Sequence, residues 1–432
     1  MASGRELFRQ ISSGAYDDAL ARLYGGGAML ARQRARYCDA LLRFETYYGH
    51  GRQVRVFSVP GRAELGGNHT DHQNGVALAA AVDLDIVVVA ADTAVPQIRV
   101  KSYGFDKLDV IDLTSIGLRA GESTHSASLI RGIAEELQRR GGRVGGFDAY
   151  TTSDVLRGSG LSSSAAFEVA MGTVLNYLYN DGRFSPLEIA QISQYAENTY
   201  FGKPSGQLDP LSCAVGGTIC VDLAHPEAPK VDRCTVDLEK LGYALCITDT
   251  RGSHSELTGE FAAVRQEMES VANQFGRAVL REVPEQEVLF SLPALRRACG
   301  DRAVLRALHF YGESRRARQA YEALCRKDAA AFLALVNESG HSAVEYNQNA
   351  FCAAQPEQQP IPVALALAQH LLQGQGAWRL QGTGFAGTIQ AFVPLGRRQA
   401  YCGAMDGVFG PGSCRAVRVR DAGCIELFCG AE

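Results

Sequence analysis

The sequence comprises 432 residues, of which 46% are hydrophobic and 21% charged, and its formal net charge is −4. This length predicts two domains, and the composition is typical of a globular protein with a sizeable core. A chain without an excess of Lys and Arg has no surplus of cations to neutralise phosphates, which argues against a nucleic-acid or membrane-surface partner. No apolar run reaches the length of a membrane span, and the polar N-terminus has no signal-peptide core.

The twelve cysteines are scattered, and no two of them form a CxxC pair. Neither a zinc ribbon nor a redox dithiol is therefore indicated. Several lie in apolar runs such as residues 244–247, as expected for buried thiols in a reducing compartment. We therefore expect a cytoplasmic protein without a membrane partner.

The predicted elements mix helices and strands. In chain order we expect helices within 1–48, strands at 54–59 and 76–91, a hairpin at 99–113, a helix at 126–140, a strand at 146–152, and helices at 165–179 and 186–200. The second half is expected to hold strands at 217–224 and 243–250, a helical block at 255–336, a loop at 350–362, a strand–turn–strand at 378–394 and a closing hairpin at 417–428. Without strict βαβ alternation, the pattern favours an α+β fold, divided into domains 1–220 and 221–432.

A glycine- and serine-rich stretch precedes the predicted helix at 165–179. It consists of Gly158, Ser159, Gly160, Leu161, Ser162, Ser163 and Ser164. Free amides that run into a helix N-terminus form an anion site, and glycines allow a phosphate to approach the backbone closely. The alternative is a Gly/Ser loop that caps a buried helix. No Lys follows the glycines, so this is not the GxxxxGK[ST] loop.

A second group of polar residues follows the strand at 54–59, which is expected to end at residues 60–61. It consists of Arg62, Asn68, His69, Asp71 and His72. Three interpretations remain open: recognition of several hydroxyl groups, a metal site, because His-x-Asp-His offers ligand types at close spacing, or a solvated turn.

Two acidic residues are further candidates. Asp209 lies between Leu208 and Pro210 and is either a helix N-cap or a carboxylate held near a substrate hydroxyl. Glu197, about three helical turns earlier, either faces the phosphate site and holds Mg²⁺ or lies on the surface.

Residues 382–387, GTGFAG, match GxGxxG, and Asp406 lies close to the spacing of a ribose-binding acid. A dinucleotide site needs a helix after the last glycine, whereas the residues after Gly387 predict a strand. We therefore expect a tight turn between antiparallel strands.

Together, these stretches resemble the GHMP kinase superfamily and, within it, the galactokinase family. The segment 60–75 is similar to the galactokinase signature, 158–165 to the phosphate loop, 204–209 to the segment with the catalytic aspartate, and 382–387 to the third motif, with Ala386 in place of the usual glycine. The resemblance implies a two-domain fold with the active site in the cleft. The N-terminal domain would be a mixed α/β domain of the ribosomal protein S5 domain 2-like type, and the C-terminal domain ferredoxin-like.

The resemblance also implies ATP-dependent, Mg²⁺-assisted phosphorylation of a small-molecule sugar at its anomeric hydroxyl, by a protein that we expect to be monomeric. The implied roles are Asp209 as general base, Arg62 as its charge partner, residues 158–164 around the ATP phosphates, Ser164 and Glu197 at Mg²⁺, and His69, Asp71 and Gly206 at the sugar.

Two positions depart from the family pattern. Asn68 stands where the family has Glu, and Phe261 where it has a sugar-contacting Tyr. An amide in place of the carboxylate that accepts a hydrogen bond from the C6 hydroxyl would better tolerate a carboxylate at C6, and plant galacturonokinases lack the same Glu and Tyr. Galacturonate is therefore the alternative substrate, and a non-catalytic sugar and nucleotide sensor a further hypothesis.

Overall fold

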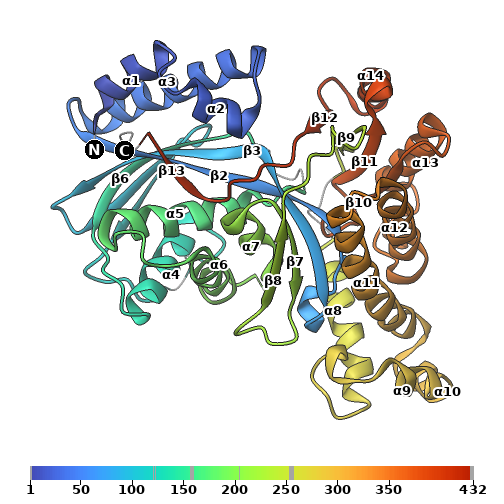
Figure 1. Cartoon of the computed structure of the whole chain (residues 1–432). Helices are drawn as coiled ribbons and strands as arrows, with labels where there is room; N and C mark the ends of the chain where they lie inside the picture. Colours follow the sequence, from blue (N-terminus) through green and yellow to red (C-terminus); the bar gives the residue numbers. More distant parts are fainter. Residues whose placement is uncertain are drawn as a thin grey trace.

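A computed structural model describes residues 2–119, 121, 123–155, 160–203, 205–252 and 257–428. Two β-sheets organise this part of the chain (Figure 1). The large sheet has the main order β1-β2-β3-β6-β4-β5, with β13 paired to β2 and β7 paired to both β3 and β8. Its strands are β1 (Ala2–Ser3), β2 (Gln53–Gly66), β3 (Val76–Thr93), β4 (Gln97–Ser102), β5 (Leu108–Asp112), β6 (Gly146–Ser153), β7 (Thr218–Asp222), β8 (Lys230–Cys234) and β13 (Ile425–Leu427). The small sheet, in the order β10-β11-β9-β12, contains β9 (Tyr243–Asp249), β10 (Ala377–Gln381), β11 (Thr388–Pro394) and β12 (Cys414–Val417).

The large sheet is covered by helices on both faces (Figure 1). Strand β3 is buried along nearly its whole length, as its β-branched run predicts for a strand between two layers. Val88 joins the core beneath one helix layer, whereas Val87 and Val89 join the core beneath the other. The first layer contains α4 (Ser126–Arg139), α5 (Ser163–Tyr179), α6 (Pro186–Tyr195) and α7 (Leu208–Val215), and the second α1 (Gly4–Ser12), α2 (Asp17–Tyr24) and α3 (Ala28–Tyr48).

Strand β2 does not end at Pro60-Gly61, contrary to the sequence-based expectation. It continues to Gly66, with register shifts against β3 between Pro60 and Arg62 and between Glu64 and Gly66. Proline has no N–H to donate to the ladder, and a bulge is one of the places where a strand accommodates it. The polar residues of the signature therefore begin on a strand and not in a loop.

The two sheets share a core. The second half of β2 and the first half of β3 contribute buried residues such as Leu65 and Leu78, which pack with Leu245 of β9 and Phe392 of β11. The helices of this half are α8 (Thr258–Asn273), α9 (Glu285–Phe290), α10 (Leu292–Cys299), α11 (Asp301–Cys325), α12 (Ala329–Ser342), α13 (Pro360–Leu372) and α14 (Arg398–Phe409). The two-sheet mixed α/β architecture confirms the expected fold class.

The last two strands do not form the expected closing hairpin. β12 pairs with β9 in the small sheet, whereas β13 pairs with β2 in the large one. Between them, the Arg420 guanidinium is fully buried and donates hydrogen bonds to Ser58 Oγ at 2.7 Å and Asp85 Oδ2 at 3.2 Å. A buried cation needs such partners, which fix the segment against the large sheet instead of allowing it to turn back.

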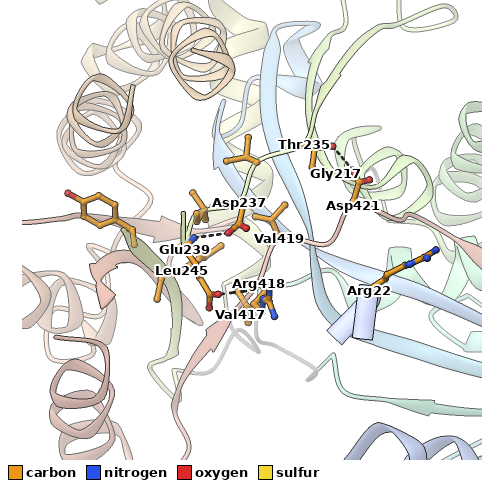
Figure 2. Close-up of a pocket in the computed structure, with 14 residues that line it drawn as sticks. Arg22, Gly217, Thr235, Asp237, Glu239, Leu245, Val417, Arg418, Val419 and Asp421 are labelled. Carbon is orange, nitrogen blue, oxygen red and sulfur yellow. Dashed lines mark hydrogen bonds and ion pairs between the residues drawn. The ribbon is translucent and has the colours of Figure 1, made fainter. Parts of the chain in front are cut away.

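The expected boundary between 220 and 221 falls within β7. We propose that the first domain extends through β8, and that β13, which follows the second domain in the sequence, also belongs to it. A cavity of about 160 Å³ lies at this seam, between the 235–239 segment and the 417–421 segment (Figure 2). Within the described ranges, no helix has the length and apolar content needed to span a membrane.

Candidate functional site

An ion pair joins β2 to α7 at the centre of the candidate site. Arg62 Nε lies 2.6 Å from Asp209 Oδ1, and the same guanidinium donates to the backbone oxygen of Gly160. Ser162 Oγ donates to the other carboxylate oxygen of Asp209. Three stretches that lie far apart in the sequence therefore meet at one carboxylate.

Asp209 is not a helix cap. The N-cap of α7 is Gln207, and Asp209 lies in the first turn. Burial alone would raise the pKa of Asp209, but the charge of Arg62 and the hydrogen bonds from Arg62 and Ser162 hold it below its ordinary value. The lowered pKa keeps the carboxylate ionised. About a third of the Asp209 side chain is exposed, so the carboxylate also remains accessible to a ligand.

The glycine- and serine-rich loop leads directly into α5. Gly158 and Ser159 lie outside the described residues. Gly160 has a φ of +66°, and Gln381 Nε2 donates to its backbone oxygen at 3.0 Å. A Cβ at Gly160 would stand 2.3 Å from Thr388 Oγ1, so glycine allows the loop to contact the third motif. The first turn of α5 presents unpaired amides next to Asp209, an arrangement that suits an anionic ligand.

The third motif is a turn between antiparallel strands, as expected. Residues 382–387 connect β10 to β11, and no helix follows them. Asp406 lies on α14 and accepts hydrogen bonds from the backbone N–H groups of Gly412 and Cys414. It therefore has a local structural role instead of the ribose-binding role that was considered.

The signature turn at 67–70 is fixed by two residues of α11 that were not among the predicted site residues. Glu313 accepts hydrogen bonds from the backbone N–H groups of Gly67 at 2.9 Å and Asn68 at 3.3 Å. His309 Nε2 lies 2.9 Å from the Asn68 backbone oxygen. Burial disfavours charge on Glu313, but His309 and nearby arginines lower its pKa to about 2. A buried Glu and His four residues apart on a long helix have no local sequence signal.

The Asn68 side chain belongs to a buried polar network. Its Nδ2 donates to Glu64 Oε1 at 2.9 Å and to the Gly382 oxygen at 2.8 Å. Its Oδ1 accepts from Asn349 Nδ2 at 2.8 Å. Arg379, fully buried on β10, holds the same Glu64 oxygen at 2.9 Å. A carboxylate is thus present beside position 68, contributed by Glu64 and neutralised by Arg379.

Asp71 and Gly206 lie in direct contact. A Cβ on Gly206 would stand only 1.7 Å from Asp71 Oδ2, so glycine is required for this approach. Burial and the nearby carboxylates of Asp209 and Glu64 raise the pKa of Asp71 to about 6. Asp71 is therefore electrostatically close to Asp209, as expected for groups around one ligand.

His69 and His72 do not support the metal-site interpretation. His69 Nε2 lies 2.9 Å from the Thr383 backbone oxygen, and burial lowers the pKa of His69 to about 4. The two imidazole centroids are 5.6 Å apart. Within the described part of the chain, these histidines and Asp71 are not among the His, Cys, Asp or Glu groups close enough to share a metal ion.

Phe261 lies on α8, which packs against the turn that contains Asp71. Its ring meets Phe385 of the third motif nearly at right angles, with centroids 5.3 Å apart. Phe261 therefore contributes an apolar edge near the signature turn.

A pair of buried acids lies near the phosphate loop. Glu197 belongs to a π-helical turn at Ala196–Phe201 and accepts a hydrogen bond from Lys203 Nζ at 2.8 Å. Glu168 on α5 is fully buried, and among the described residues neither of its carboxylate oxygens has a hydrogen-bond partner. Burial and the charge of Glu197 raise the pKa of Glu168 well above its ordinary value. A cation close to both carboxylates would reduce their repulsion and favour the ionised form of Glu168.

These acids fit a divalent cation. Ser164 lies in the first turn of α5, four residues before Glu168, and therefore on the same helix face. Mg²⁺ commonly takes one or two carboxylates and completes its shell with water and phosphate oxygens. Glu168 was not among the predicted site residues, although a single acid in the apolar run AAFEVAMG is a usable signal.

Comparisons with known proteins agree with this geometry. Residues 128–217 match the GHMP kinases N terminal domain, and residues 42–92 match the galactokinase galactose-binding signature. A galactokinase of Actinobacillus pleuropneumoniae serotype 3 is 32% identical over 82% of this chain and 89% of its own length. One from Streptomyces coelicolor is 30% identical over 88% and 95%.

Solved structures show the same fold. The structure of Lactococcus lactis galactokinase complexed with galactose covers 89% of this chain and 98% of its own, with a TM-score of 0.78 at 24% identity. Methanococcus jannaschii mevalonate kinase covers 85% and 98%, with a TM-score of 0.59 at 15% identity.

The raised pKa of Asp71 leads to a prediction about stability. Because the folded pKa of about 6 exceeds the ordinary 3.8, the folded state binds this proton more tightly, and the associated stability is lost as the pH rises through 6. Asp71→Asn should therefore increase the free energy of unfolding at pH 7.5 by about 1 kcal/mol. Urea denaturation at several pH values would measure this gain, which should vanish towards pH 4.

Asp181→Asn, at a side chain that is almost fully exposed, provides the control substitution. A gain for Asp71→Asn that is equal at pH 4 and pH 7.5, or a loss at both, would contradict the predicted titration.

Proposed function

The chain belongs to the galactokinase family, and on this basis we propose that it transfers the γ-phosphate of MgATP to the anomeric hydroxyl of galactose or a close relative. The observation that carries the proposal is the convergence on Asp209 of Arg62 from the signature strand and Ser162 from the phosphate loop. We further propose that the protein acts as a cytoplasmic monomer on small molecules alone, in agreement with its net charge of −4.

In the proposed mechanism, Asp209 either accepts the proton of the anomeric hydroxyl of the sugar or orients this hydroxyl for attack. Arg62 keeps this carboxylate ionised, and the accessible third of its side chain allows a hydroxyl to approach. Phosphoryl transfer requires an acceptor in line with the γ-phosphate and neutralisation of charge, with little other chemistry from the protein. The loop after Gly158 would hold the phosphates with backbone amides and serine hydroxyls.

Ser164, Glu197 and Glu168 would hold the Mg²⁺ that neutralises charge on the phosphate oxygens. Asp71, His69 and Gly206 would bind sugar hydroxyl groups. Asp71 and Gly206 are already in contact with each other, and His69 is fixed by the third motif.

Two observations favour galactose over the alternative, galacturonate. Both donor hydrogens of the Asn68 amide are already engaged by Glu64 and Gly382, so none is available for a carboxylate at C6. The negative charge that the family carries at position 68 is also retained nearby, on Glu64. Arg379 is already paired with Glu64, so its charge is not free to balance a uronate carboxylate in this buried site.

The proposed role of Glu168 can be tested without turnover. Glu168→Gln should weaken the affinity for Mn²⁺, in the presence of a non-hydrolysable ATP analogue, by about 10- to 100-fold. Electron paramagnetic resonance of free Mn²⁺ would measure this. The metal-free variant should also be more stable than the parent protein, because a buried carboxylate without hydrogen bonds is removed. The exposed Glu338 is the matched control, and unchanged Mn²⁺ affinity in Glu168→Gln would remove Glu168 from the cation site.

The role of Asp209 predicts a separation of binding from turnover. Asp209→Asn should lower kcat by about 10²- to 10⁴-fold, the usual contribution of a positioned general base. Its affinity for ATP, measured by calorimetry, should change little, since the phosphate loop is intact. Asp181→Asn again serves as the control, and near-normal turnover in Asp209→Asn would exclude this residue from the mechanism.

Substrate choice is tested by ADP release with galactose, galacturonate, glucuronate, N-acetylgalactosamine and arabinose. We expect kcat/KM for galactose to exceed that for galacturonate by about 10- to 100-fold, equivalent to about 1.4–2.8 kcal/mol. Preference for galacturonate would establish the alternative. Failure to consume ATP with any of these sugars would instead favour a non-catalytic sensor.

Two variants test the Glu64–Asn68 arrangement within the same assay. Asn68→Glu alone should weaken galactose binding, because it places a second carboxylate beside Glu64. Combining it with Glu64→Gln should restore galactose binding, because a single carboxylate remains near Arg379. Equal galactose binding by the single and double variants would contradict the proposed repulsion between carboxylates at positions 64 and 68.

A further inference from the structure

Three cysteines meet on the small sheet, away from the residues discussed above. Cys246 comes from β9, Cys414 from β12, and Cys402 from α14, the helix that packs on both strands. The Sγ of Cys402 lies 3.9 Å from that of Cys246 and 3.5 Å from that of Cys414, and all three sulfur atoms lie within 4.8 Å of one another. Cys246 lies 156 residues before Cys402, which is itself 12 residues before Cys414, so only the fold brings the first cysteine to the other two.

The spacing of the sulfur atoms matches a thiolate metal centre. Three thiolates at a Zn–S distance of about 2.3 Å in tetrahedral geometry have sulfur atoms about 3.8 Å apart. The two measured distances, 3.5 and 3.9 Å, bracket this value. A disulfide would need one sulfur pair at about 2.05 Å. Among the described residues, this is the one group of three or more His, Cys, Asp or Glu whose ligand atoms are close enough to hold one metal ion.

The residues around the three cysteines also resemble the surroundings of known metal sites. Asp406 lies one helical turn after Cys402 on α14 and accepts a hydrogen bond from the backbone N–H of Cys414 at 2.8 Å. The helix that carries Cys402 therefore also holds Cys414 in place. Such outer partners orient metal ligands in known sites. The hydroxyls of Thr248 and Tyr401 are buried, and neither has a hydrogen-bond partner of normal geometry in the part of the chain that the structure describes. Both residues are sequence or strand neighbours of the cysteines.

We propose that Cys246, Cys402 and Cys414 form a binding site for a thiophilic metal ion of the Zn²⁺ class. The three thiols would release their protons to solvent on binding, and the partly exposed Cys402 leaves the fourth position open to water. The ion would fasten α14 to β9 and β12. The site faces the core that α13 and α14 build on the small sheet, whereas Leu245 and Ile247 face the shared core between the sheets. The proposal is independent of the kinase activity.

The test uses the full chain, purified under reducing conditions without chelators. Zinc content by mass spectrometry should be stoichiometric, and Cd²⁺ titration should produce the ultraviolet charge-transfer band of cadmium thiolates. Cys402→Ser should abolish both signals, and Asp406→Asn should weaken Zn²⁺ affinity by about 10- to 100-fold. Cys325→Ser, at an exposed thiol on α11, is the matched control and should retain both.

A second readout is thermal stability. A strong chelator should lower the unfolding temperature of the parent protein and of Cys325→Ser, but not that of Cys402→Ser. Metal binding that persists in Cys402→Ser, the absence of a cadmium–thiolate band in the reduced protein, or a disulfide between two of the three cysteines in protein that binds no metal would each overturn the proposal.

Discussion

The ion pair between Arg62 and Asp209 is the interaction on which the candidate site depends. Arg62 is almost completely buried, so its charge requires a partner. It finds one in Asp209 and a further acceptor in the Gly160 backbone. Loss of either member of such a pair leaves an uncompensated buried charge, at a cost of about 3–5 kcal/mol. The signature strand, the phosphate loop and the first turn of α7 are therefore held in one arrangement by one side chain.

The site also depends on the second half of the chain. The signature turn is fixed by Glu313 and His309 of α11, and the Asn68 side chain by Arg379-bound Glu64, Asn349 and the third motif. These buried hydrogen bonds cross the junction between the two sheets. A change in the packing of α11 or β10 would therefore be transmitted to the turn that carries His69 and Asp71, without any direct contact with a ligand.

The sequence predicts the parts of this structure that rest on local patterns. Apolar periodicity located most helices and strands, and the order of the motifs indicated that Arg62, Asp209 and the loop at 158–164 belong together. Strand pairings between distant parts of the chain were harder to predict from the sequence. The continuation of β2 past Pro60 depends on two bulges against β3, and the separation of β12 from β13 depends on the buried partners of Arg420.

The hydrogen bonds of Asn68 could not be predicted from the sequence either, because they too depend on long-range contacts. The resemblance to the galactokinase signature implies that a carboxylate is missing at position 68, but only the fold reveals that Glu64 places one beside it. Glu168 is an intermediate case, because an acid inside an apolar helix is visible in the sequence while its distance from Glu197 is not.

The return of β13 to the large sheet has a consequence for biosynthesis. Residues 425–427 complete the edge of β2, a strand that begins at residue 53. During translation, that edge stays open until residues 425–427 have left the ribosome, and open strand edges invite association with other chains. The N-terminal half thus cannot mature before the C-terminal half is made. A truncation or a rigid fusion just before residue 425 would consequently damage the half of the protein that was synthesised first.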